Sequence, residues 1–178
     1  MKIKTKLQMI TSLLIMLYVG VGGVLFYTLG KIHDEFYFLK DVASQSKILT
    51  LTINKDMNYV SRVTRDIMLG NDYERNIHKL DETSEKIAKN FDALVKLAQT
   101  KHDEKVIKDA KDKALGFIEK SSSVIHTLDN TAQTQSDFNK VYVMYKAEAT
   151  PLAESARDAF DLLVKTKDQD LEQATQEL

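Results

Sequence analysis

The sequence contains no cysteine, one proline and six glycines among its 178 residues, and four of those glycines lie at or before Gly30. The absence of cysteine excludes disulfides, thiol catalysis, cysteine-ligated zinc and c-type haem attachment. The residues after Gly30 are almost free of helix breakers, which favours long helices. A domain of this composition has to be held together by packing alone.

Neither sign of charge is in large excess, because 25 Lys and Arg residues stand against 26 Asp and Glu residues. Nucleic-acid binding requires a basic face that displaces counterions, so we expect no nucleic-acid partner. The sequence also lacks a Ser-His-Asp constellation in a strand-turn-helix context, a glycine-rich phosphate loop and a metal-ligand spacing. We therefore expect neither enzymatic activity nor a cofactor.

The four histidines, at positions 33, 78, 102 and 126, are scattered along the chain. None has the spacing of a zinc-binding motif. A zinc site would require His78 and His126 to face each other, and ordinary surface histidines are the favoured interpretation.

Residues 7–30 contain no charged side chain. A helix of about 24 residues reaches about 36 Å, enough to cross a hydrocarbon core of about 30 Å. Lys2, Lys4 and Lys6 precede it without an acidic residue, so the positive-inside rule places residues 1–6 in the cytoplasm. We predict a transmembrane helix in the inner (cytoplasmic) membrane, with residues 31–178 in the periplasm or the extracellular space.

A cleaved signal peptide is the alternative for this segment. Signal peptides have a shorter apolar region, about 7–15 residues, that ends in a small-x-small cleavage site. Here Gly20, Gly22 and Gly23 fall within the apolar run, and its end at Phe26–Gly30 offers no Ala-x-Ala site. We therefore favour an uncleaved anchor.

Apolar and small residues recur at alternating steps of four and three from residue 32 to residue 67, the pattern of a helix that packs on other helices. This seam contains Ile32, Phe36, Leu39, Ala43, Ser46, Thr50, Ile53, Met57, Val60, Thr64 and Ile67. It continues in phase from the apolar segment. We therefore predict that the membrane helix is continuous with a first domain helix at about residues 31–69, which the sequence Gly70-Asn71-Asp72 ends.

Three further helices are predicted, at about residues 73–100, 104–129 and 134–176. Their seams contain Ile77, Leu80, Ser84, Ile87, Phe91, Leu94 and Ala98; Ile107, Ala110, Ala114, Phe117, Ser121, Val124 and Leu128; and Phe138, Val141, Tyr142, Tyr145, Ala149, Leu152, Ala156, Ala159 or Phe160, and Leu163. Asp103 is expected to cap the second of these helices. Pro151 predicts either a kink or a new helix start capped by Thr150.

Short connections force these helices to lie antiparallel to their neighbours. The predicted fold is therefore an all-α, up-down-up-down four-helix bundle preceded by one transmembrane helix. Residues 165–178 are polar with weak periodicity, and no second apolar run follows them. Since the last helix should return toward the membrane, the protein either has one anchor or, as we expect, continues into a second span after residue 178.

This arrangement resembles the outer sensor of methyl-accepting chemotaxis proteins. The local match is Val60–Asp72, which is similar to the family's end of helix one, with arginines before a short turn. The resemblance implies a homodimer that is embedded in the membrane, and downstream signalling domains that this chain does not contain. Similar modules precede histidine kinases and nucleotide cyclases, so the output stays open.

The candidate ligand site lies near the membrane-distal end, at about 10 Å from the helix termini. Its residues are Arg62, Arg65, Tyr59, Tyr142, Tyr145 and Lys146. Two guanidinium groups on the outward face of the first domain helix can clamp a carboxylate, and in the family similar arginines bind amino-acid carboxylates between two first helices. Alternatively, both are surface arginines paired with Asp66, Asp56 or Asp72.

The sequence thus predicts a sensor that binds a small anion, either an amino acid or another carboxylate, and that shifts its last helix. The sequence is also compatible with two other interpretations. The bundle is either an interaction module that docks a periplasmic binding protein, which a broad apolar patch near the tip would favour, or a tethered structural spacer.

Overall fold

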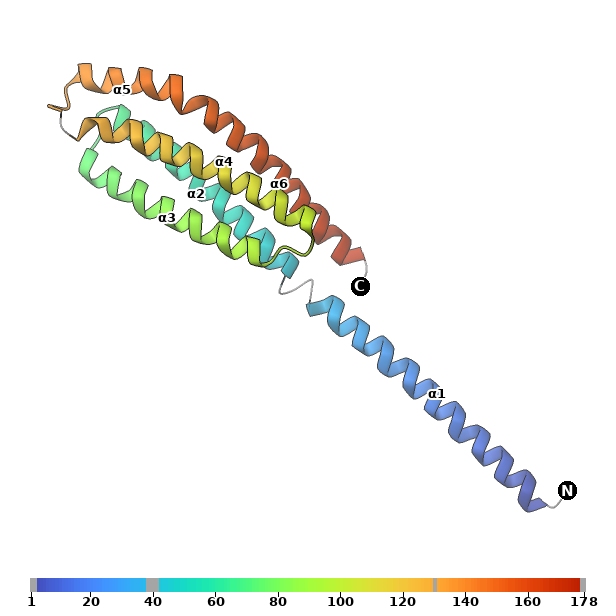
Figure 1. Cartoon of the computed structure of the whole chain (residues 1–178). Coiled ribbons are helices and arrows are strands. Elements are labelled where there is room, and N and C mark those ends of the chain that lie inside the picture. Colours follow the sequence, from blue (N-terminus) through green and yellow to red (C-terminus); the bar gives the residue numbers. More distant parts are fainter. Residues whose placement is uncertain (1–2, 38–41, 130, 177–178) are drawn as a thin grey trace.

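The computed structural model describes residues 3–37, 42–129 and 131–176 (Figure 1). The helices are α1 (Ile3–Tyr37), α2 (Ser44–Met68), α3 (Tyr73–Lys96), α4 (Lys101–Ile125), the 3-10 turn η2 (His126–Leu128), α5 (Gln135–Glu148) and α6 (Thr150–Gln176). No strand occurs within these ranges. The all-α prediction is confirmed.

Four antiparallel members form the bundle: α2, α3, α4, and α5 followed by α6 (Figure 1). Helix α2 packs against α3 and α6, and α4 packs against the same two helices. Helix α1 projects away from the bundle, and α6 returns toward the end from which α1 departs (Figure 1). The two sides of α2 therefore face two different grooves, one toward α3 and one toward α6.

The predicted seams form the core. All seven predicted seam residues of α4 and its η2 extension are buried, and the α3 seam is buried except for the partly exposed Ser84 and Ala98. Phe91 of α3 and Phe160 of α6 meet edge to face, with ring centroids 6.5 Å apart. The alternating steps of four and three residues thus locate the core-facing positions of α3 and α4 correctly.

Some predicted seam residues lie outside the core. Ile32 and Phe36 belong to α1 and are 49% and 54% exposed, because this helix leaves the bundle. Tyr142 and Leu152 are also exposed, on α5 and α6. The predicted continuity of the membrane helix with the first domain helix, and the predicted seam residue Leu39, fall on residues 38–41, outside the described residues.

The cap of α4 differs from the prediction. Thr100, not Asp103, is the N-cap, and its hydroxyl accepts a hydrogen bond of 3.0 Å from the backbone N–H of Asp103. The Asp103 carboxylate accepts in return from the backbone N–H of Gln99, at 3.2 Å. Helix α4 consequently begins at Lys101, three residues earlier than predicted, and Asp103 lies in its first turn.

The predicted break around Pro151 occurs at Ala149. Helix α5 ends at Glu148 and α6 begins at Thr150, and Ala149 between them keeps near-helical backbone angles. The Thr150 hydroxyl donates a hydrogen bond to the carbonyl of Tyr145 instead of capping a new helix. The proline therefore produces a kink, as one of the two predictions stated.

The turn between α2 and α3 requires a glycine. Gly70 has a φ of +79°, in the left-handed region, and a Cβ at this position would lie 3.3 Å from the ring of Phe138. Asp72 then caps α3 by accepting from the backbone N–H of Arg75 at 3.2 Å. The predicted end of the first domain helix at residues 70–72 is confirmed.

Helix α1 contains the segment Gln8–Tyr37, in which an 18-residue stretch has a mean hydropathy of 2.2, and the segment is long and apolar enough to cross a membrane. No part of this segment is buried in the bundle. By length and composition, α1 is therefore a candidate membrane-spanning helix.

Candidate functional site

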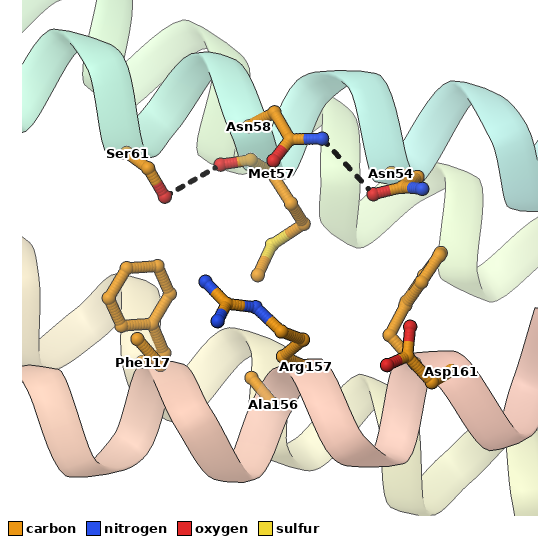
Figure 2. Close-up of a pocket in the computed structure, with 10 residues that line it drawn as sticks. Asn54, Met57, Asn58, Ser61, Phe117, Ala156, Arg157 and Asp161 are labelled. Atoms are coloured by element: carbon orange, nitrogen blue, oxygen red, sulfur yellow. Dashed lines mark hydrogen bonds between the residues drawn. The ribbon is translucent and has the colours of Figure 1, made fainter.

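A small cavity lies in the groove between α2 and α6, with a volume of about 80 Å³ (Figure 2). Its lining comes from α2, α4 and α6, and consists of Asn54, Met57, Asn58, Ser61, Phe117, Ala153, Ala156, Arg157, Phe160 and Asp161. Helix α2 contributes amides and a hydroxyl, α6 contributes a cation and an anion, and α4 contributes an aromatic ring. The lining therefore combines opposite charges, hydrogen-bonding groups and apolar surface.

The polar residues of this groove share faces because of helical spacing. Arg157 and Asp161 are four residues apart on α6, and Asn54, Asn58 and Ser61 follow each other on α2 at steps of four and three. The Asn58 amide nitrogen donates to the Asn54 amide oxygen at 3.2 Å, and the Ser61 hydroxyl donates to the carbonyl of Met57 at 3.2 Å. These local bonds orient the α2 side of the groove (Figure 2).

Small residues leave the space in which the cavity forms. Ala153 and Ala156 face the cavity from α6, where longer side chains would fill it. Phe117 of α4 and Phe160 of α6 are buried and close the groove on the core side. Arg157 and Asp161 themselves are exposed residues at the rim of this apolar floor.

The two charged side chains of the groove have no protein partner among the described residues, in which no ion pair or hydrogen bond involves Arg157 or Asp161. The Arg157 guanidinium lies between Phe117 and Met57, and Asp161 lies toward Asn54 (Figure 2). A guanidinium group binds carboxylates in a bidentate manner, and a carboxylate binds ammonium groups. This groove can therefore bind both charges of a zwitterion.

The structure brings two of the predicted site residues together. The Arg62 guanidinium lies 4.9 Å from the centroid of the Tyr59 ring, a cation–π contact. Both residues line an open groove of about 530 Å³ between α2 and α3, together with Lys55, Asp56, Asn58, Thr83 and Lys86. Asp56, one predicted partner of the arginines, pairs instead with Lys86 at 2.9 Å.

The other predicted site residues are spread over different surfaces. Tyr145 of α5 is half-buried, with its hydroxyl 3.4 Å from the hydroxyl oxygen of Thr64 on α2. Tyr142 and Lys146 are exposed on α5, and Arg65 is exposed on α2. Among the described residues, the side chains of Arg65 and Lys146 take part in no ion pair or hydrogen bond. Their role in ligand binding stays a prediction.

The tip holds a polar cluster that joins α3 to the end of α4. The Tyr73 hydroxyl donates to one oxygen of Asp129, and Nδ1 of His126 lies 2.9 Å from the other. Burial, followed by the hydrogen bond to Asp129, raises the pKa of Tyr73, and the hydrogen bonds from Tyr73 and His126 lower the pKa of Asp129. His78 is exposed, and the described residues contain no cluster of three metal-binding side chains.

The lowered pKa of Asp129 predicts a loss of stability in acid. The native state keeps this carboxylate ionised at pH values where the unfolded state takes up a proton. The contribution of Asp129 to the free energy of unfolding is therefore complete above about pH 4, and it is lost as the pH falls through the native pKa. We expect the Tm of Asp129→Asn to depend less steeply on pH than that of the unaltered protein between about pH 5 and pH 2. Equal slopes in thermal melts across this range would contradict the assignment.

Arg157 was not found from the sequence. The predicted seam of α6 passes through Ala156 and Phe160, and Arg157 directly follows a seam position. The available signal was the pair of alanines on α6, at positions 153 and 156, opposite polar residues of α2. These alanines indicate a cavity only when α6 is known to lie beside α2.

Comparison with known protein families matches the chain to the family described as a four helix bundle sensory module for signal transduction, over residues 1–178. No curated protein and no solved structure matches the chain. The match covers the apolar helix α1 as well as the bundle. The chain therefore belongs to this family of four-helix-bundle sensory modules, the type found in methyl-accepting chemotaxis proteins.

Proposed function

We propose that this chain is the ligand-sensing part of a transmembrane chemoreceptor and that it binds a small amino acid or carboxylate between α2 and α6. The observation that carries the proposal is the unpaired guanidinium of Arg157 in the cavity of that groove. Asp161 and the amides of Asn54 and Asn58 supply partners for an ammonium group and for further oxygens. A cavity of about 80 Å³ suits a ligand of a few heavy atoms.

A ligand in this groove would act on the helix that returns toward the membrane. It would contact α2 and α6 at once, so its binding favours one position of α6 relative to α2. Shifts of about 1–2 Å are typical of such switches. In this proposal α1 anchors the protein in the inner membrane and the bundle lies in the periplasm or the extracellular space.

The proposal includes a homodimer. The outer face of α2 exposes Ile48, Leu51 and Leu69, and a second copy of the chain that packs on this face would cover these apolar side chains. Sedimentation of the full chain in detergent tests this part, and a monomer across the micromolar range would contradict it.

Calorimetric titration of the full chain in detergent, against amino acids, dicarboxylates and inorganic anions, tests the ligand. Loss of a charge-assisted hydrogen bond of about 1.5–3 kcal/mol predicts that Arg157→Ala weakens binding about 10–100-fold. Arg157→Lys keeps the charge without the bidentate geometry, so an intermediate affinity is expected.

The variant Arg62→Ala is the matched control, since Arg62 lies over the Tyr59 ring in the groove toward α3. We expect its affinity to stay within about threefold of the unaltered protein. Loss of binding in this variant alone would move the site to the outer face of α2, as the sequence predicted. Absence of binding to every compound would contradict the proposal.

A second candidate function is the docking of a periplasmic binding protein on α5. This helix exposes Tyr142, Val143 and Met144 near the tip, and Val143 and Met144 line a shallow surface groove with Ser136, Asn139 and Lys140. The variant Val143→Lys should abolish docking while leaving binding of free small ligands intact. The opposite pattern would exclude this function.

A further inference from the structure

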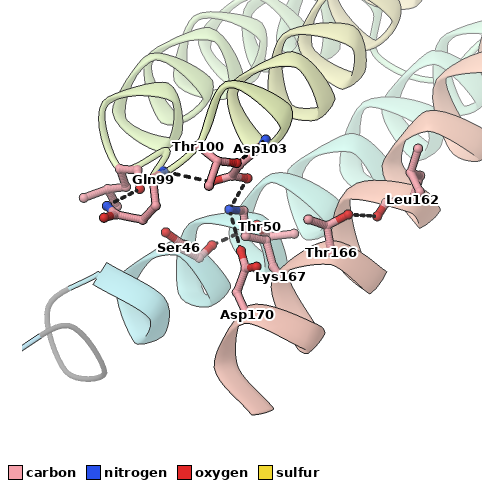
Figure 3. Close-up of polar contacts among 10 residues, drawn as sticks. Ser46, Thr50, Gln99, Thr100, Asp103, Leu162, Thr166, Lys167 and Asp170 are labelled. Carbon is pink, nitrogen blue, oxygen red and sulfur yellow. Dashed lines mark hydrogen bonds and ion pairs between the residues drawn. The ribbon is translucent and has the colours of Figure 1, made fainter. Parts of the chain in front are cut away.

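A buried polar layer crosses the end of the bundle that lies farthest from Gly70 (Figure 3). Ser46 and Thr50 contribute to it from α2, Asp103 from α4 and Lys167 from α6, and all four are buried. Lys167 is 2% exposed and follows Phe160 and Leu163 at steps of three and four. It therefore occupies a core position of α6 with a charged side chain.

One carboxylate connects two parts of this layer. An oxygen of Asp103 accepts from the ammonium group of Lys167, and its other oxygen accepts from the backbone N–H of Gln99 at 3.2 Å. Asp103 therefore ties α6 to the turn between α3 and α4. Asp168, the next residue of α6, pairs with Lys47 of α2. Two adjacent residues of α6 are thus bonded to the two helices that flank it, α4 and α2.

Each member of the buried pair has a second partner that would stay with it if α6 moved. Lys167 also donates to Asp170 at 3.0 Å, and Asp170 lies on the same helix. Asp103 keeps the Gln99 N–H, which belongs to its own turn. A buried charge left alone is strongly unfavourable, but here the bond between helices can break without isolating either charge.

The bond is also sensitive to axial position. Hydrogen bonds of this type span about 2.7–3.2 Å, so a slide of α6 by about 2 Å would either break the bond or force the buried Lys167 side chain out of its present rotamer. The apolar contacts of Phe160 and Leu163 are less directional and tolerate such a slide better. Among the contacts of α6 described above, the polar layer distinguishes one register from its neighbours most sharply.

We propose that Lys167 and Asp103 form a latch that holds α6 in one axial register against the start of α4, and that release of this latch separates two positions of α6. In the released position Lys167 is neutralised by Asp170 alone. The latch deepens the proposed function, since it rests on α6 as the moving helix, but it makes no assumption about the ligand.

Double electron–electron resonance on the full chain in detergent, without ligand, tests the latch. Because the sequence has no cysteine, the replacements Glu119→Cys and Gln169→Cys would carry the only spin labels. Position 119 lies about 24 Å along α4 from Asp103, so the distance between the labels reports axial movement of α6 directly. Both replaced residues are exposed.

We expect one narrow distance distribution in the labelled protein. In Lys167→Met, which keeps the volume without the charge, the distribution should broaden and its mean should shift by about 2 Å. Asp103→Asn should behave likewise, because its amide oxygen can still accept from Gln99. Lys120→Met, which removes the exposed pair of Lys120 with Glu148, is the control and should leave the distribution unchanged.

Unchanged distributions in both Lys167→Met and Asp103→Asn would overturn the latch, as would an equal shift in the Lys120→Met control. If Lys167→Met does not fold, Asp103→Asn decides the matter by itself. Failure of every calorimetric titration would contradict the proposed ligand but would leave this measurement unaffected, so the two proposals fail separately.

Discussion

Phe91→Ala is expected to lower the free energy of unfolding by about 3–5 kcal/mol. Phe91 is 0% exposed in the C-terminal part of α3, and its ring packs edge to face on Phe160 of α6. The substitution removes this contact and leaves a cavity that the surrounding helices fill only in part. Since domains are stable by about 5–15 kcal/mol in total, this variant should lie close to its unfolding threshold.

Guanidinium denaturation of the full chain in detergent, followed by circular dichroism, measures this change. Leu162→Ala is the matched control, because Leu162 is 52% exposed on α6 and should cost less than about 1 kcal/mol. A loss below about 1.5 kcal/mol for Phe91→Ala would show that α3 and α6 do not meet through this ring.

Asp103→Ala is expected to destabilise the bundle by about 3 kcal/mol. Removal of one partner of a buried ion pair costs about 3–5 kcal/mol, and the lower end applies because Asp170 still neutralises Lys167. The substitution also removes the acceptor of the Gln99 N–H at the start of α4. The turn between α3 and α4 should loosen together with the end of α6.

The single variants Asp103→Ala and Lys167→Met, together with the double variant, form a double-mutant cycle. Because a buried pair replaced by apolar groups often costs little, the double variant should be more stable than Asp103→Ala alone, with a coupling energy above about 1 kcal/mol. Additive effects of the two substitutions would contradict a direct interaction between Asp103 and Lys167.

The order and number of the bundle helices could be predicted because each seam follows helical spacing with few breaks. The α4 seam from Ile107 to Leu128 is a full success, since every predicted member is buried. Gly70 likewise marked the turn between α2 and α3, because its left-handed backbone favours glycine. These features depend on neighbours in the sequence.

Features that depend on which environment surrounds a helix could not be predicted in the same way. Ile32 and Phe36 continue the seam in phase, but apolar spacing looks the same on a helix that faces lipid and on one that faces a core. Lys167 shows the reverse case. Lys167 occupies a core position that its charge argued against, because a lysine is buried only where it has a partner. That partner, Asp103, lies on another helix and cannot be identified from the sequence.

The candidate site required the rotation of α6 against α2, which spacing within one helix does not supply. Arg62 was correctly placed on an outward face of α2, and the structure shows it over the Tyr59 ring in the groove toward α3. Arg157 lies on the opposite side of α2, in the groove toward α6. Only the packed bundle distinguishes these two grooves.

Nuclear magnetic resonance of the arginine Nε–H groups tests most directly whether Arg157 binds the anionic group of the ligand. Titration of the isotopically labelled full chain with the tightest-binding compound from calorimetry should shift the Arg157 signal in a saturable manner. The Arg62 and Arg65 signals should stay in place. A saturable shift at Arg62 or Arg65 with an unchanged Arg157 signal would contradict the account.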